Sequence, residues 1–135
     1  MELLLGFGRL NRVRFLAYTN IVFGFLILVV LSITTLFPSG DHTNISLVFG
    51  GLGLIIGCKF AVQRYHDVGA NGFWSISYLT PGQPLVYLIL GSVPGDKAEN
   101  KYGTPNPENS PLLWFFAIFP LITVTSCILW FQLSL

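Results

Sequence analysis

Long apolar runs constrain this chain more than any other feature. Three of them cover residues 15–37, 45–63 and 112–134, and each holds at most one charged residue. As a helix, such a run is about long enough to cross a hydrocarbon core roughly 30 Å thick. A weaker run covers residues 73–93. We therefore predict an all-α protein, a polytopic membrane helix bundle that forms a single domain with four membrane segments.

A basic segment, residues 1–14, precedes the first run. It carries Arg9, Arg12 and Arg14, and basic residues beside a membrane helix hold that end in the cytoplasm. In a helix, Arg9 and Arg12 would share a face because they are three residues apart. Anchoring alone explains these arginines; the alternative is a site for lipid phosphate or an acidic partner. We predict a multi-pass protein with its N-terminus in the cytoplasm.

The weaker run is interrupted by two prolines, Pro81 and Pro84. Proline removes a backbone donor and frees a carbonyl upstream, so a helix here must kink or break. We favour a kinked helix that spans the membrane; the alternative is a re-entrant hairpin with two short arms. In either case the broken backbone has to be covered by protein or water. Turn-forming residues then fill a polar loop, residues 94–111.

Small residues form a stripe along the second apolar run. They recur every three or four positions, at Gly50, Gly53, Gly57 and Ala61. Such a stripe lets another helix approach closely, so we expect it to pack within the monomer, with a dimer interface as the lesser option. Arg64 continues the stripe, whereas Lys59, Gln63 and His66 fall on the opposite face, which we expect to be polar.

A few isolated residues inside the apolar runs carry further expectations. Asn20 should find a hydrogen-bond partner on another helix, because lipid offers its amide none. Trp114 and Trp130 are 16 residues apart, about 24 Å along a helix, so we expect one at each membrane interface. Cys58 and Cys127 have no metal-ligand spacing and are expected to be small buried residues.

A dense polar island, residues 63–74, joins the second run, 45–63, to the weaker run, 73–93. Within it, Gly69 suits the left-handed residue that ends a helix. Asn71 suits the N-cap of the helix that follows. The island therefore predicts a helix end, a tight turn and a helix start at the membrane surface.

Asp67 is the most informative residue of this island. It follows a helix whose C-terminus carries partial negative charge, which disfavours a carboxylate by a few tenths to about 1 kcal/mol. Arg64 precedes it by three residues, and the N-terminal arginines lie on the same membrane face. We predict an Arg–Asp–Arg cluster in which Arg64 and at least one of Arg9 and Arg12 hold an ionised Asp67.

Three short motifs follow one another along the chain. They are Phe7, Gly8, Arg9, Arg12 and Phe15; then Arg64, His66, Asp67, Gly69, Gly72 and Trp74; then Asn100, Tyr102, Gly103 and Pro107. Together, over about residues 7–107, they resemble the domain of unknown function 805 family of small bacterial inner-membrane proteins. The chain departs from the usual pattern at Tyr65, Asn71, Phe73 and Lys101, and more so in its added run at 112–134. The resemblance implies an inner-membrane location and brings no established activity.

The sequence also lacks the motifs of several functional classes. No nucleophile motif, phosphate-binding loop or zinc spacing occurs, and no basic-aromatic surface typical of nucleic-acid binding. We therefore expect no catalysis, cofactor, metal or nucleic acid. The candidate functional cluster is Arg9, Arg12, Arg64, His66 and Asp67, with a secondary motif of Asn100, Tyr102 and Gly103.

Two classes of function remain. The first is a non-enzymatic membrane module that binds anionic lipid or a protein partner through this cluster. The alternative is a small transporter or channel subunit that acts as a homo-oligomer. In that case the broken third segment and the face with Lys59 and His66 would form the path.

Overall fold

The computed structural model describes residues 8–120, and these residues are helical apart from turns and one loop. The helices are α2 (Arg12–Leu36), α3 (Thr43–Asp67), the 3-10 helix η1 (Gly72–Leu79), α4 (Gln83–Ser92) and a last helix, Pro111–Pro120. Within the described part, strand-like pairing is limited to an isolated bridge between Asn100 and Gly103. The all-α prediction is confirmed for these residues. Expectations for Cys127, Trp130 and most of segment 112–134 lie outside them.

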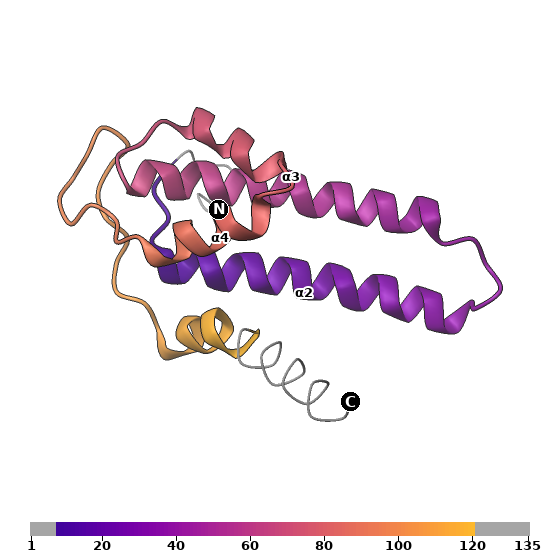
Figure 1. The fold of residues 1–135 in the computed structure, drawn as a ribbon. Coiled ribbons are helices and arrows are strands. Elements are labelled where there is room, and N and C mark those ends of the chain that lie inside the picture. Colours follow the sequence, from indigo (N-terminus) through magenta and orange to yellow (C-terminus); the bar gives the residue numbers. More distant parts are fainter. Residues whose placement is uncertain (1–7, 121–135) are drawn as a thin grey trace, which may run out of the picture.

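Helices α2 and α3 form the long axis of the molecule and lie side by side, antiparallel (Figure 1). Each has 25 residues, about 37 Å at roughly 1.5 Å per residue. Both are apolar enough to cross a membrane, and their most apolar windows are only 11% and 22% buried. The core helix of a soluble protein would bury far more, so these two helices suit a lipid surrounding.

The turn between α2 and α3 is short and is stabilised locally. The backbone N–H of Thr43 donates to the Asp41 carboxylate at 2.9 Å. Hydrogen bonds from the backbone and hydroxyl of Thr43 lower the pKa of this exposed carboxyl. Because Asp41 accepts from a residue two positions on, it starts α3 where His42 makes no side-chain cap.

The seam between α2 and α3 depends on part of the predicted stripe of small residues. A Cβ on Gly53 would lie 3.2 Å from Leu26 Cδ1, and one on Gly57 would lie 2.7 Å from Tyr78 Cε1. Ala61 is fully buried. A Cβ on Gly50 would meet no atom within 4 Å, so Gly50 takes no part in the close packing within the monomer. The close packing is within the monomer, as expected.

The segment 73–93 is broken, as predicted, but it does not run the length of α3. Helix η1 packs along α3 from Gly72, which lies beside His66. Helix α4 then returns, so that the Val93 carbonyl accepts a hydrogen bond from Arg64. Figure 1 shows both arms over one half of the α2–α3 pair. The favoured expectation of a kinked helix spanning the bundle is wrong; the alternative with two short arms describes the structure.

The prolines explain where this hairpin turns. Pro84 occupies the first turn of α4, where its missing N–H leaves no helical bond unmade. Pro81 lies between η1 and α4, where Gln83 N–H donates to the Thr80 carbonyl at 2.9 Å and closes the turn. Each proline thus takes a position that a continuous helix could not provide.

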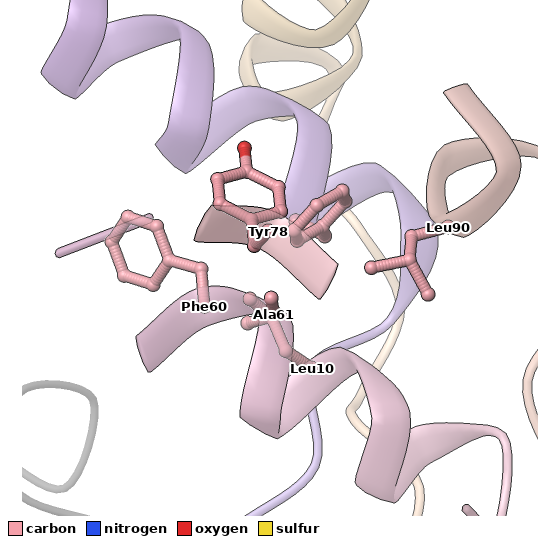
Figure 2. Packing of buried hydrophobic residues seen from close by; sticks show 6 residues of the cluster. Leu10, Phe60, Ala61, Tyr78 and Leu90 are labelled. Carbon is pink, nitrogen blue, oxygen red and sulfur yellow. The ribbon is translucent and has the colours of Figure 1, made fainter. Parts of the chain in front are cut away.

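A compact apolar cluster holds the hairpin against the two long helices. Figure 2 shows Tyr78 of η1 above Phe60 and Ala61 of α3, with Leu90 of α4 and Leu10 of the N-terminal segment beside them. All five are buried. Full burial of each large side chain contributes about 1.5–3 kcal/mol where the alternative is water.

The last helix, Pro111–Pro120, is tied to α2 through Asn20. Pro120 has no N–H for the Phe116 carbonyl, and the Asn20 side chain donates to that carbonyl at 3.0 Å. Asn20 also donates to the Ala117 carbonyl at 3.2 Å and accepts from the Tyr87 hydroxyl at 2.7 Å. The expected interhelical partner of Asn20 is therefore confirmed, on two helices at once.

Candidate functional site

The site lies where α3 ends and the hairpin begins. Gly69 has φ +74°, the left-handed conformation expected of it. Asn71 caps η1, because its side chain accepts from the Phe73 N–H at 3.0 Å. A Cβ on Gly72 would lie 2.8 Å from His66 Nε2, so the turn closes tightly on α3. Both turn predictions from the sequence are confirmed, with a 3-10 helix in place of an α-helix.

At the end of α3, Asp67 binds two arginines, and we call Arg9, Arg64 and Asp67 the Asp67 cluster. Arg9 Nε donates to Asp67 Oδ1 at 3.0 Å, with side chains 0% and 3% exposed. Arg64 Nη1 donates to the other carboxylate oxygen. The predicted Arg–Asp–Arg contact is therefore present. Arg12 is not part of it: its side chain is exposed and makes no hydrogen bond or ion pair with residues 8–120.

Arg64 also joins α3 to the end of α4. Its Nε donates to the Leu90 carbonyl at 2.8 Å, and its Nη2 donates to the Val93 carbonyl. The last carbonyls of a helix lack helical partners and carry partial negative charge, so a guanidinium there satisfies both needs. Arg64 thereby fixes the returning arm of the hairpin at the level of Asp67.

Arg9 makes equivalent contacts with the loop that follows α4. It donates to the carbonyls of Asp96, Ala98 at 2.6 Å and Gly103 at 3.2 Å. The Asp96 N–H in turn donates to the Asp67 carbonyl at 2.8 Å. One arginine therefore joins the N-terminal segment, the end of α3 and the loop.

The secondary motif closes over this cluster. Gly103, at φ +116°, pairs with Asn100 in a tight turn. The Asn100 side chain donates to the His66 carbonyl at 3.0 Å and to Asp96 Oδ2 at 2.9 Å. The Tyr102 ring stacks on His66, with centroids 3.8 Å apart and planes 7° apart. The structure thus brings the two predicted motifs together, although about 35 residues separate them in the chain.

Asparagines join the N-terminal segment to the same loop, and the sequence analysis missed them. Asn106 Oδ1 accepts from the Asn11 N–H at 2.6 Å, and Asn106 Nδ2 donates to the Arg9 carbonyl at 3.1 Å. Asn109 accepts from Asn11 at 3.0 Å and from Arg14 at 3.3 Å. Asn11 also caps α2. Asparagines between prolines at 105–111 indicated turns in the sequence. They did not indicate that these side chains bind the N-terminal segment.

Gly95 is a second residue that sequence reasoning did not single out. A Cβ at this position would overlap the Asp67 carboxylate. The loop backbone therefore lies directly against the cluster, and only glycine fits there. The dipeptide Pro94-Gly95 indicated a turn but could not indicate its contact with Asp67.

The arrangement is closed rather than open to a reactant. Both carboxylate oxygens of Asp67 accept from arginines, and the cluster is buried. Gln63 and His66, on the face opposite the stripe that was expected to be polar, are buried as well. Residues 8–120 contain no group of three His, Cys, Asp or Glu side chains that could hold a metal ion. The geometry suits a clamp that joins four chain segments.

A shallow groove lies next to the cluster, and we call it the Arg12 groove. It has a volume of about 260 Å³ and includes Asn11, Arg12, Asp96, Asn109 and Trp114 in its lining. Arg12 and Trp114 are exposed there. In this groove the guanidinium of Arg12 remains accessible beside the buried cluster.

Comparison with known proteins gives one match. Residues 6–104 match the family described as protein of unknown function, DUF805. Neither the curated proteins nor the solved structures contain a match to this chain. The matched range includes the three N-terminal arginines, both arms of the hairpin, the Asp67 cluster and the Asn100–Gly103 turn. The chain therefore belongs to the DUF805 family of proteins of unknown function.

Proposed function

We propose that this chain is a non-enzymatic module of the bacterial inner membrane that binds anionic lipid at its cytoplasmic face. The observation that carries the proposal is Arg12, an exposed guanidinium without a partner among the described residues, beside a cluster that has neutralised its own carboxylate. The Asp67 cluster itself acts as a clamp. Of the candidate cluster expected from the sequence to contact lipid, we assign that contact to Arg12 alone.

The Arg12 groove has the chemistry that a phosphodiester headgroup requires. Arg12 supplies charge, Asn109 and Asn11 supply amide groups, and Trp114 supplies an aromatic ring of the kind that gathers at headgroup level. Asp96 is the one exposed acid in the lining, and Asn100 donates to its carboxylate at 2.9 Å. Asp67 also borders the groove, but it is paired with Arg9 and Arg64. Counted together, the three arginines exceed the two acids, and this local surplus of positive charge favours an anion over a zwitterion.

The overall charge distribution supports the orientation. With a re-entrant hairpin, all seven lysine and arginine residues of the chain lie toward the end that holds the N-terminal segment. Of the acidic residues between 8 and 120, only Asp41 lies at the opposite end. An excess of basic residues marks the cytoplasmic side, so we place the Asp67 cluster and the loop 94–110 there.

Lipid competition would test the proposal. The purified chain, in mixed micelles with equal phosphatidylglycerol and phosphatidylcholine, is analysed by native mass spectrometry. Arg12→Gln should lower the ratio of bound phosphatidylglycerol to phosphatidylcholine about fivefold, since one cation near a membrane surface contributes about 1 kcal/mol.

Lys97→Gln is the matched control, because it removes one exposed positive charge from the same end of the molecule without touching the groove. It should leave the ratio within about twofold of the wild type. Equal losses in both variants would mean diffuse attraction and no site at Arg12. A co-purifying protein displaced by Arg12→Gln, with the lipid ratio unchanged, would favour the partner-binding form of the module.

A second candidate function is a small transporter or channel subunit acting as a homo-oligomer. One observation favours it, a niche between α2 and the tip of the hairpin that contains the polar side chains of Asn20 and Gln83. Polar groups at this depth are uncommon unless they serve a path or a packing role.

A further inference from the structure

The hairpin tip places broken backbone deep in the apolar part of the molecule. Thr80, Pro81 and Gly82, which join η1 to α4, are exposed. Their neighbour Gln83 lies in the same niche as Thr19 of α2. Thr19 is seven residues into α2, about 10 Å from its cytoplasmic end. Backbone groups exposed at that depth must be satisfied by protein or by water.

The niche beside the tip is roomy, and polar side chains project into a lining that is otherwise apolar. It has a volume of about 200 Å³ and is lined by Thr19, Asn20, Phe23, Gln83, Pro84 and Tyr87. A water molecule needs only about 10–15 Å³ of such space, provided that polar partners surround it. The side chains of Gln83 and Tyr87 and the amide of Asn20 are partners of this kind.

Two buried hydroxyls next to the niche make no hydrogen bond of normal length and angle with the described residues. They are Thr19 Oγ1 and the Tyr78 hydroxyl, on residues 4% and 0% exposed. Gln83 and Thr19 lie close enough to the Tyr78 hydroxyl for weak hydrogen bonding. Figure 2 shows this hydroxyl pointing away from the apolar cluster. A buried hydroxyl without a well-placed partner costs about 1–3 kcal/mol, so a small ligand that bonds both hydroxyls would stabilise the fold.

The lining defines the chemical class of that ligand. It contains hydroxyls, amides, aromatic carbon and proline, and no ionisable acid or base apart from the tyrosine phenol. A charged ligand would be poorly compensated there, because desolvating an ion without a counter-charge costs several kcal/mol. The ligand is therefore neutral and both donates and accepts hydrogen bonds.

We propose that this niche is a hydration site, a small group of waters about 10 Å inside the bundle that satisfies Thr19, Tyr78 and the backbone of the hairpin tip. Water has the size, the neutrality and the donor–acceptor character that the lining demands. Helix η1 and α4 then need no second protein to cover their junction. The site also gives the tip an aqueous contact at a depth where the outer faces of α2 and α4 are apolar.

Thiol reactivity measures this water directly, because a charged methanethiosulfonate reagent reaches and modifies only a hydrated thiolate. The full chain, with Cys58→Ala and Cys127→Ala, is reconstituted in lipid vesicles and carries Gln83→Cys. The matched control is Leu88→Cys. Leu88 lies on α4, five residues nearer the cytoplasmic end than Gln83, and it is an apolar residue with 52% of its surface exposed. We expect position 83 to react at least tenfold faster, although it is deeper. Equal rates, or a faster reaction at 88, would overturn the proposal.

An isosteric change supplies an independent readout that does not depend on the introduced cysteine. Thr19→Val removes the unpartnered hydroxyl and keeps the shape. If water binds Thr19, the variant should have a lower Tm than the parent and should slow the labelling of Gln83→Cys severalfold. A raised Tm would mean that the wild-type hydroxyl is dry and unsatisfied, and would overturn the proposal.

Discussion

At residue 67 a carboxylate occupies the end of α3, where the helix dipole opposes it. Arg9 and Arg64 reverse that balance, since both bind the carboxylate within a buried setting. The cluster carries a net positive charge, and the free carbonyls at the end of α4 accept from Arg64. Opposite charges and carbonyl dipoles thus compensate one another without solvent.

Removal of one partner of the buried Arg9–Asp67 ion pair should lower stability by more than the intact pair contributes to it. Asp67→Asn would leave two buried guanidinium groups facing each other, and Arg9→Gln would leave carboxylate and loop carbonyls short of donors. Each change should lower the free energy of unfolding by roughly 3–5 kcal/mol. Denaturant titration in detergent, followed by tryptophan fluorescence, measures both.

The double variant distinguishes a coupled cluster from two independent sites. Its loss of unfolding free energy should be smaller than the sum of the single losses, because it has neither two facing guanidinium groups nor an underpaired carboxylate. Arg64 remains, bonded to the carbonyls at the end of α4. Arg12→Gln is the control, since Arg12 has no bond to Asp67, and it should change stability by less than about 0.5 kcal/mol. Additive losses for Arg9 and Asp67 would contradict the coupling.

At the scale of single elements, the seam between α2 and α3 offers a matched pair of glycines. Gly57 contacts Tyr78 and Phe23, whereas Gly50 has open space around it. Gly57→Leu should force the hairpin and α2 away from α3 and cost several kcal/mol or abolish folding, because a packed core does not accept added volume. Gly50→Leu should have nearly wild-type stability.

Thermal unfolding in detergent, read as the loss of a monodisperse elution peak, compares the two variants. The same test examines the stripe as a whole. Equal stability of the two leucine variants would mean that α2 and α3 do not pack through Gly57. A defect confined to Gly50→Leu would assign that position to contact with another copy of the chain.

The helices and turns fall into two groups, those that could be predicted from the sequence and those that could not. Apolar length identified α2 and α3, and left-handed glycine and Asx preferences identified the turn at Gly69 and Asn71, because these are local properties. Pro81 and Pro84 predicted the break for the same reason. The direction of the returning arm depends on Arg64 bonding a carbonyl 29 residues away, at Val93, and no local pattern encodes that contact.

Prediction of the site followed the same division. Charge compensation identified Asp67, Arg64 and Arg9, because an acid at a helix end needs a partner. It overestimated Arg12, since three-residue spacing implied a shared face, but Arg9 precedes the start of α2 and is not helical. The contacts of Gly95 and Asn106 depend on how the loop folds back, so their partners were not predictable.

Across the molecule, the packing depends on one arrangement. The clamp at the Asp67 cluster gathers the N-terminal segment, the end of α3, the end of α4 and the loop at one end of the bundle. Figure 1 shows these segments together, with the connection between α2 and α3 at the far end. In a membrane, the loop 94–110 and the turn 37–42 must then lie on opposite sides.

Side-specific thiol labelling of spheroplasts tests this arrangement most directly. In the background without native cysteines, Asp41→Cys and Lys97→Cys each introduce one exposed thiol. An impermeant maleimide should label Asp41→Cys in intact spheroplasts and Lys97→Cys only after the membrane is permeabilised. Labelling of Lys97→Cys from outside, with the spheroplasts intact, would show that segment 73–93 crosses the membrane and would contradict the re-entrant clamp.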